Sequence, residues 1–157
     1  MSRKRMSNLL EKTEQRIIRW MSRWGILLLR VSLGIVFFWF GFLKFFPGLS
    51  PAQELAVRTI SVLTFGLLPA KASILILATW EVLIGIGLML GIQLRLTLLL
   101  LFLQMLGTMT PLVLFPHQVF TRIPYAPTLE GQYIIKNIVI ISAGFVIGST
   151  LKKREPN

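Results

Sequence analysis

The sequence predicts an all-α fold: an integral membrane four-helix transmembrane bundle, with an N-terminal amphipathic interfacial helix and a short helix over the outer face. Hydrophobic residues make up 54% of the 157 residues, and the mean hydropathy of +0.72 is well above that of a soluble domain. Four apolar runs each have close to the length needed to cross a bilayer core, which is about 20 residues. These runs cover about residues 25–46, 72–90, 96–115 and 133–151.

The distribution of basic residues predicts that both termini are cytoplasmic. Eleven of them precede the first run, follow the last, or lie between the second and the third, whereas the other two connections hold three. Cytoplasmic loops carry such an excess of Lys and Arg, and an even number of spans agrees with this orientation. The same distribution argues against a nucleic acid partner despite the net charge of +11.

Residues 1–24 predict a cytoplasmic amphipathic segment. Apolar side chains recur there at helical spacing among basic ones: Leu10, Ile17, Met21 and Trp24. This pattern is typical of a helix that lies on the inner leaflet and is attracted to anionic lipid; a frayed, partly helical tail is the alternative. The rest of the chain divides into one four-span domain, residues 25–151, and a basic cytoplasmic tail, residues 152–157.

The first span is expected to end at the Pro47-Gly48 pair, which cannot continue a helix. Ser50 and Pro51 are the residue types of a helix N-cap and a first-turn proline, which predicts a short helix over residues 52–68. This segment is too polar for a fifth span, and we expect it to cap the outer face. Whether it is interfacial or re-entrant stays open.

The later connections follow from turn residues. A tight turn near Gly91 and Gln93 predicts an antiparallel hairpin of the second and third spans. Pro111 breaks the hydrogen-bond ladder of the third span and is expected to bend it. Residues 116–132 then form an outer loop before the fourth span.

Charged and amide side chains within the spans are the strongest functional signal. A charge in hydrocarbon costs at least ~2.5–3.5 kcal/mol, so such residues usually face protein or water and mark a site. Because the spans alternate in direction, most of these side chains fall in the outer half, where they would line an outward-opening pocket. The predicted ligand-binding residues are Lys44, Glu81, Gln104, Glu130, Lys136 and Asn137, with Trp39 and Trp80 as walls.

Glu81 lies near the middle of its span, where it cannot reach the headgroups. We expect it to be a neutral hydrogen-bond donor or to pair with a lysine, with Lys136 as the first choice and Lys44 as the second. Lys44 shares one face of the first span with Gly34 and Gly41, which let another backbone approach closely. Such a pair either fixes the packing of the helices or belongs to a ligand or proton site.

Several chemistries are excluded by composition. The chain has no cysteine and a single histidine, His117, so it has no thiol redox chemistry of its own and cannot hold a multi-histidine metal or a bis-histidine haem. We therefore expect no metal and no haem. The four spans leave no room for a soluble catalytic domain, and whether the protein is an enzyme stays open.

Four stretches resemble the DoxX-like superfamily of small four-helix membrane proteins, especially its YkgB-like branch. They are Arg30–Pro47 (RVSLGIVFFWFGFLKFFP), Trp80–Leu88 (WEVLIGIGL), Thr110–Val113 (TPLV) and Glu130–Asn137 (EGQYIIKN). The resemblance covers about residues 25–150 and implies a multi-pass protein of the bacterial inner (cytoplasmic) membrane. It links the chain to thiosulfate:quinone oxidoreductase subunits, oxidative-stress complexes, reactive-chlorine resistance and, in animals, receptor-assembly chaperones.

Two functional hypotheses follow. In the first, the protein holds a small hydrophobic or amphiphilic ligand, a quinone or a lipid, in the outward-opening polar pocket, as a membrane subunit of a redox or stress-response complex. In the second, it is a non-catalytic assembly or chaperone-type protein whose buried charges only fix the bundle, with a membrane protein partner or a second copy beside it. A transporter is disfavoured because the spans lack two matching broken segments.

Overall fold

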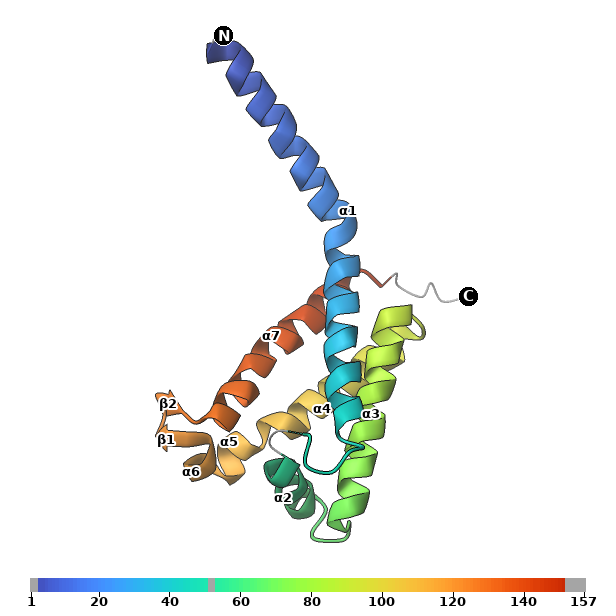
Figure 1. Cartoon of the computed structure of the whole chain (residues 1–157), viewed down its shortest axis with the longest axis vertical. Helices are drawn as coiled ribbons and strands as arrows, with labels where there is room; N and C mark the ends of the chain where they lie inside the picture. Colours follow the sequence, from blue (N-terminus) through green and yellow to red (C-terminus); the bar gives the residue numbers. More distant parts are fainter. Residues whose placement is uncertain (1–2, 51–52, 152–157) are drawn as a thin grey trace.

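The computed structural model describes residues 3–50 and 53–151, and most of them are helical (Figure 1). The long helices are α1 (Arg3–Leu43), α2 (Gln53–Leu63), α3 (Ala70–Leu90), α4 (Leu94–Met109) and α7 (Leu129–Ser149). Shorter elements between α4 and α7 are α5 (Pro111–Leu114), α6 (Pro116–Val119) and the strands β1 (Phe120–Arg122) and β2 (Ala126–Pro127). The predicted tail at residues 152–157 and the predicted first-turn proline, Pro51, lie outside the described residues.

Four segments of the described chain are long and apolar enough to cross a membrane. They are Leu10–Leu43, Ala70–Leu90, Leu94–Leu114 and Leu129–Ser149. The all-α membrane bundle predicted from the sequence is confirmed, and the protein is a multi-pass membrane protein. We call the end where α2, α5, α6 and the β1–β2 hairpin lie the α2 end, and the end with the α3–α4 turn the terminal end (Figure 1).

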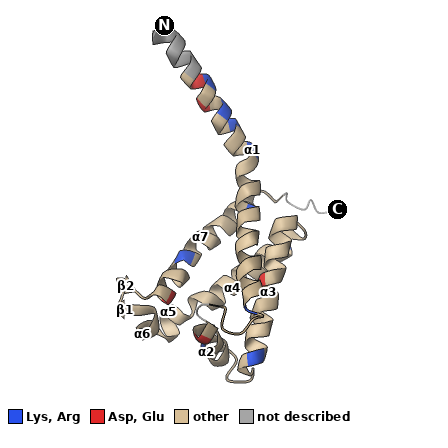
Figure 2. Ribbon diagram, viewed as in Figure 1, with Lys and Arg blue, Asp and Glu red and all other residues tan. Residues whose placement is uncertain are grey.

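The N-terminal segment and the first span form one uninterrupted helix, α1, rather than the two elements that the sequence predicted. Its N-terminal part extends well beyond the bundle (Figure 1), and residues 10–28 are exposed. Gly25 is the one helix-weakening residue at the predicted boundary, and a glycine inside a helix costs only about 1 kcal/mol relative to alanine. That cost does not end a helix. Figure 2 shows basic and acidic residues along this extension and few charged residues in the bundle.

Helices α1 and α3 are in close contact through glycines. A Cβ added at Gly41 would lie 2.7 Å from the Glu81 Cβ, and one at Gly85 would lie 2.7 Å from the Phe38 Cα. A Cβ at Gly34 would lie 2.9 Å from the backbone nitrogen of Met89. Separations this short leave no room for a methyl group, so the two backbones pack directly against each other. The predicted role of Gly34 and Gly41 is confirmed.

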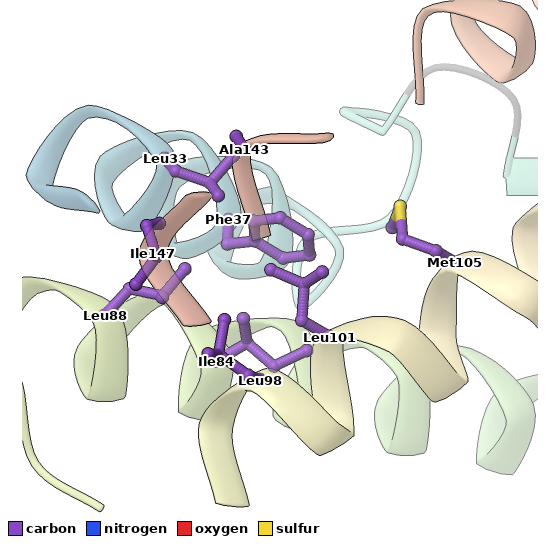
Figure 3. Close-up of a cluster of buried hydrophobic side chains, with 9 residues drawn as sticks. All are labelled: Leu33, Phe37, Ile84, Leu88, Leu98, Leu101, Met105, Ala143 and Ile147. Carbon is purple, nitrogen blue, oxygen red and sulfur yellow. The ribbon is translucent and has the colours of Figure 1, made fainter. Parts of the chain in front are cut away.

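Figure 3 shows the main cluster of buried apolar side chains, most of whose members belong to the half of the bundle nearer the terminal end. The α3 and α7 members come from the last two turns of those helices, and two of the three α4 members come from its first turns. The cluster consists of Leu33, Phe37, Ile84, Leu88, Leu98, Leu101, Met105, Ala143 and Ile147. The helices are therefore packed tightly at one end, and the predicted polar residues lie toward the other.

The connections differ in detail from the prediction. Helix α2 ends at Leu63 rather than at residue 68, because Phe65 has a positive φ of 53° and the Gly66 amide donates to the Ser61 carbonyl at 2.7 Å, which closes the helix. The bend predicted at Pro111 is present as the break between α4 and α5.

Helix α7 starts at Leu129, four residues before the expected boundary at 133. The Thr128 hydroxyl accepts a hydrogen bond from the Gly131 amide at 3.1 Å and so caps the helix. The small antiparallel hairpin before it, in which Phe120 lies opposite Pro127, was not predicted.

Replacing Gly85 by alanine tests the α1–α3 contact. We expect Gly85→Ala to lower the free energy of unfolding by about 1–3 kcal/mol, because the new methyl group overpacks a direct backbone contact. Gly25→Ala is the control, since its Cβ meets nothing within 4 Å and alanine is the better helix former. The measurement is titration of the detergent-solubilised protein with dodecyl sulfate, followed by circular dichroism. Equal unfolding midpoints for Gly85→Ala and the wild type would contradict the contact.

Candidate functional site

Glu81 is the centre of a polar network that joins three helices. Its Oε2 pairs at 2.6 Å with the ammonium of Lys44, the residue that directly follows α1. Its Oε1 accepts a hydrogen bond at 2.8 Å from the side-chain amide of Gln104 on α4. The Lys44 ammonium also donates to the Phe40 carbonyl at 3.3 Å. Glu81 is 8% exposed. Both of its oxygens are therefore satisfied, as a buried carboxylate requires.

The close α1–α3 contact brings this pair together. Gly41 lies directly against the Glu81 Cβ, and Lys44 follows Gly41 by three residues, so both are on the same helix face. The Lys44 backbone amide donates to the Gly41 carbonyl at 3.1 Å, which tightens the last turn of α1. A bulkier residue at position 41 would push α3 away and separate the two charges.

A cavity of about 530 Å³ opens beside this network, toward the α2 end. Its walls come from α1, α2, α3, α4, α5 and α7, and most of the lining side chains are apolar. The charged and amide side chains in the lining are Lys44, Glu81, Gln104, Glu130, Lys136 and Asn137. All six polar residues predicted for the pocket thus line one cavity.

A second polar contact joins α7 to α4 in the wall of the cavity. The Asn137 amide donates to the Thr108 hydroxyl at 3.3 Å, and this hydroxyl donates to the Met105 carbonyl at 3.1 Å. One of the two N–H donors of Asn137 is therefore committed to the protein. The Gln104 Oε1 atom is buried and has no hydrogen-bond partner among the described residues.

Lys136 is not the partner of Glu81, although the sequence analysis placed it first. In the described part of the chain the carboxylate pairs with Lys44, the second choice. The Lys136 side chain is exposed and its ammonium lies 5.7 Å from the centre of the Tyr133 ring. The choice between the two lysines depended on the separation of α3 from α1 and from α7, which helix periodicity does not give.

Of the two tryptophans predicted as walls, the structure places one beside the cavity. Trp80 lines the cavity, and its indole N–H donates to the Leu100 carbonyl at 3.1 Å. Trp39 is 63% exposed and is not part of the lining. It follows Phe37 by two residues, which turns it by about 200° around the helix. Since Phe37 faces the core, Trp39 points away from it.

Helix α2 contributes a wall that the sequence analysis missed, because the segment was expected only to cap the outer face. Its lining residues are Leu55, Ala56, Thr59, Ile60 and Leu63. They recur at steps of one and three, which is the period of one helix face. This periodicity was the available signal, and the polar residues of the same segment obscured it.

The site offers hydrogen bonds and charge within an apolar cavity. The residues that the structure describes contain no group of three or more histidine, cysteine, aspartate or glutamate side chains placed to hold a metal ion. The lysines donate and the carboxylates accept, so the arrangement can orient a molecule whose polar head meets these groups and whose apolar part fills the remaining volume.

The ion pair can be tested by substitution. We expect Lys44→Met to lower the free energy of unfolding by about 3–5 kcal/mol, because it leaves the Glu81 carboxylate buried without a counter-charge. Glu81→Gln should cost less, and the double variant should cost less than the sum, with a coupling of about 0.5–3 kcal/mol.

Lys136→Met is the matched control for Lys44→Met, since it removes a lysine that has no carboxylate partner in the described chain. Its loss of stability should be smaller and should add to that of Glu81→Gln. Coupling of Glu81 to Lys136 rather than to Lys44, measured by thermal unfolding of the variants in a neutral maltoside detergent, would contradict the geometry.

Comparison with known proteins places this site in a family. No curated protein and no solved structure matches the chain. A family model described as DoxX matches residues 25–117, more than half of the chain, and this stretch holds Lys44, Glu81 and Gln104. The YkgB-like branch stays a prediction. Because the match spans three of the four membrane segments and the whole ion-pair network, the chain belongs to the DoxX family.

Proposed function

We propose that this DoxX-family protein holds a small hydrophobic or amphiphilic ligand, a quinone or a lipid, in the cavity beside Glu81. The observation that carries the proposal is the cavity itself, which has a volume of about 530 Å³, apolar walls and a few convergent polar groups. Small-molecule sites in proteins have volumes of about 300–1,000 Å³ and are lined in the same way, by mostly apolar side chains with a few polar groups. Intramembrane ionisable groups beside it support a binding role.

The polar groups suit the head of such a ligand. Lysine has three N–H donors, and Lys44 uses two of them on Glu81 and Phe40, so a third remains for a ligand carbonyl or anionic group. Lys136 and the second N–H of Asn137 add further donors from the opposite wall. In this role Glu81 holds the Lys44 ammonium in place, and α2 and α3 supply the surface for the apolar part.

The proposal includes a location and an orientation. We place the protein in the bacterial inner membrane with both termini in the cytoplasm, since most of its basic residues lie in the termini and in the α3–α4 turn. The cavity then opens toward the outer face. In this setting a ligand-holding subunit would serve a redox or stress-response complex, as the resemblance to DoxX-like proteins implies.

The alternative is an assembly protein whose buried charges only fix the bundle, with another membrane protein or a second copy as its partner. Exposed aromatic side chains on α1, such as Trp39 and Phe42, are available for a partner. A lipid-facing helix carries the same residues, so they do not favour assembly over ligand binding. Stoichiometric co-purification of a partner, combined with no ligand binding, would support the alternative.

Ligand binding can be measured as thermal stabilisation in a neutral maltoside detergent. A short-chain quinone or a lysophospholipid at about 100 times its dissociation constant should stabilise the wild type by about 2.7 kcal/mol. Gly107→Phe should abolish this effect: Gly107 lines the cavity, and its Cβ would meet nothing within 4 Å, so the new side chain starts in open space beside the cavity and its ring is expected to occupy part of it.

Gly25→Phe is the matched control, because its Cβ also meets open space but lies outside the cavity. It should respond to the ligand as the wild type does. If neither a quinone nor a lipid stabilises the wild type, or if Gly107→Phe binds as well as Gly25→Phe, the cavity is not a ligand site.

The orientation has its own test, which the absence of native cysteine makes simple. Tyr125→Cys places a thiol in the turn between β1 and β2, where the side chain is 72% exposed. Gln15→Cys places one on the exposed extension of α1. A membrane-impermeant thiol reagent should label the first in cells with a permeabilised outer membrane and the second only after lysis. The opposite pattern would invert the proposed topology.

A further inference from the structure

Lys136 is the cation of the cavity that has no ion pair in the described chain, whereas Lys44 pairs with Glu81. It follows the first residue of α7 by seven positions, about 10 Å along the helix axis, so it lies well inside the span. Its side chain is exposed, it lines the cavity, and its one described contact is with the face of the Tyr133 ring. A lone ammonium at that depth is unfavourable unless an anion or water accompanies it.

The four charged residues of the lining sum to zero, but Lys136 lies deeper in the α7 span than Glu130. Lys44 and Glu81 neutralise each other. Glu130, the fourth charged residue of the lining, is in the first turn of α7, six residues before Lys136. That spacing separates the two by about 9 Å along the helix and turns them to different faces. A carboxylate in the first turn is also stabilised by the helix dipole at its own position.

Hydrogen-bond donors outnumber acceptors at this point. Lys136 brings three N–H groups, and Lys44 and Asn137 each have one that the protein does not use. The amide oxygens left as acceptors are Gln104 Oε1, which is a buried atom, and Asn137 Oδ1. A ligand group that meets this surface must therefore accept hydrogen bonds, and a charged acceptor makes stronger ones than a neutral acceptor.

We propose that the ligand of this cavity is an anionic amphiphile, a single-chain molecule with one carboxylate or phosphate head that pairs with Lys136. This inference rests on the proposed ligand-binding function and specifies the charge of the head group. The apolar chain lies along the walls from α2 and α3, and the head sits between α7 and the Lys44 end of α1. A neutral head would leave Lys136 without a counter-charge.

The test compares probes that share a chain and differ in head group: dodecanoate, dodecyl phosphate and dodecanol, each titrated into the protein in maltoside at pH 8. The wild type should bind the two anions at least about tenfold more tightly than the alcohol, as expected for hydrogen bonds to a charged group. The ratio of dodecanoate to dodecyl phosphate affinity identifies the preferred head. Inorganic phosphate, which has the charge without the chain, should not compete at the same concentrations.

Substitutions then test whether the preference for an anionic head group depends on Lys136. In Lys136→Gln the anions should bind no more than about threefold more tightly than dodecanol, while the affinity for dodecanol itself stays unchanged. Lys136→Arg should retain the preference for the anions. Lys71→Gln is the matched control, because it removes one positive charge from an exposed position outside the cavity. It should retain the full preference.

Each contrary result has one meaning. Equal binding of the alcohol and the anions by the wild type overturns the anionic head while the ligand-binding function stands. An equal loss of preference in Lys71→Gln, or effective competition by inorganic phosphate, also overturns it, because the attraction is then a general effect of charge. If the wild type binds none of the amphiphiles, and no quinone either, the proposed function itself fails.

Discussion

The pairing of Lys44 with Glu81 is the interaction on which the rest of this structure depends. It is possible only because Gly41 has no side chain, which lets α3 approach α1 until the Glu81 Cβ touches the α1 backbone. In an apolar surrounding each charge alone is costly, so the pair holds the two helices at one separation. Gln104 extends the constraint to α4 by taking the second carboxylate oxygen. Three of the four membrane segments are thereby tied at one level.

This constraint divides the bundle into two unlike halves. Toward the terminal end, branched apolar side chains from all four membrane segments fill the interior (Figure 3). Toward the α2 end, the same helices enclose a cavity, and α2 supplies its additional wall. Close packing of one half gives the rigidity that the other half needs to keep a volume of about 530 Å³ open to a ligand.

Hydropathy and helix periodicity were sufficient for the fold and for most of the site. Span number, the glycine face of α1 and the six polar residues of the cavity follow from the apolar runs and from the alternating direction of the spans. The partner of Glu81, the outward position of Trp39 and the wall from α2 do not follow. They depend on how each helix is rotated and tilted, and a uniformly apolar span carries little information on rotation.

The spacing of the glycines in α1 has a consequence for how the helix chooses its position along α3. Gly34 and Gly41 are seven residues apart, so sliding α1 by two turns, about 10.5 Å, would bring Gly34 to the place of Gly41 and preserve a close backbone contact there. The same shift would bring Leu27 to the place of Gly34, where a Cβ would lie only 2.9 Å from the Met89 backbone nitrogen. In the shifted arrangement Phe37 would occupy the place of Lys44, and a ring would face the Glu81 carboxylate. The paired glycines and the lysine therefore select the same position of α1 along α3, one by excluding side chains and the other by charge.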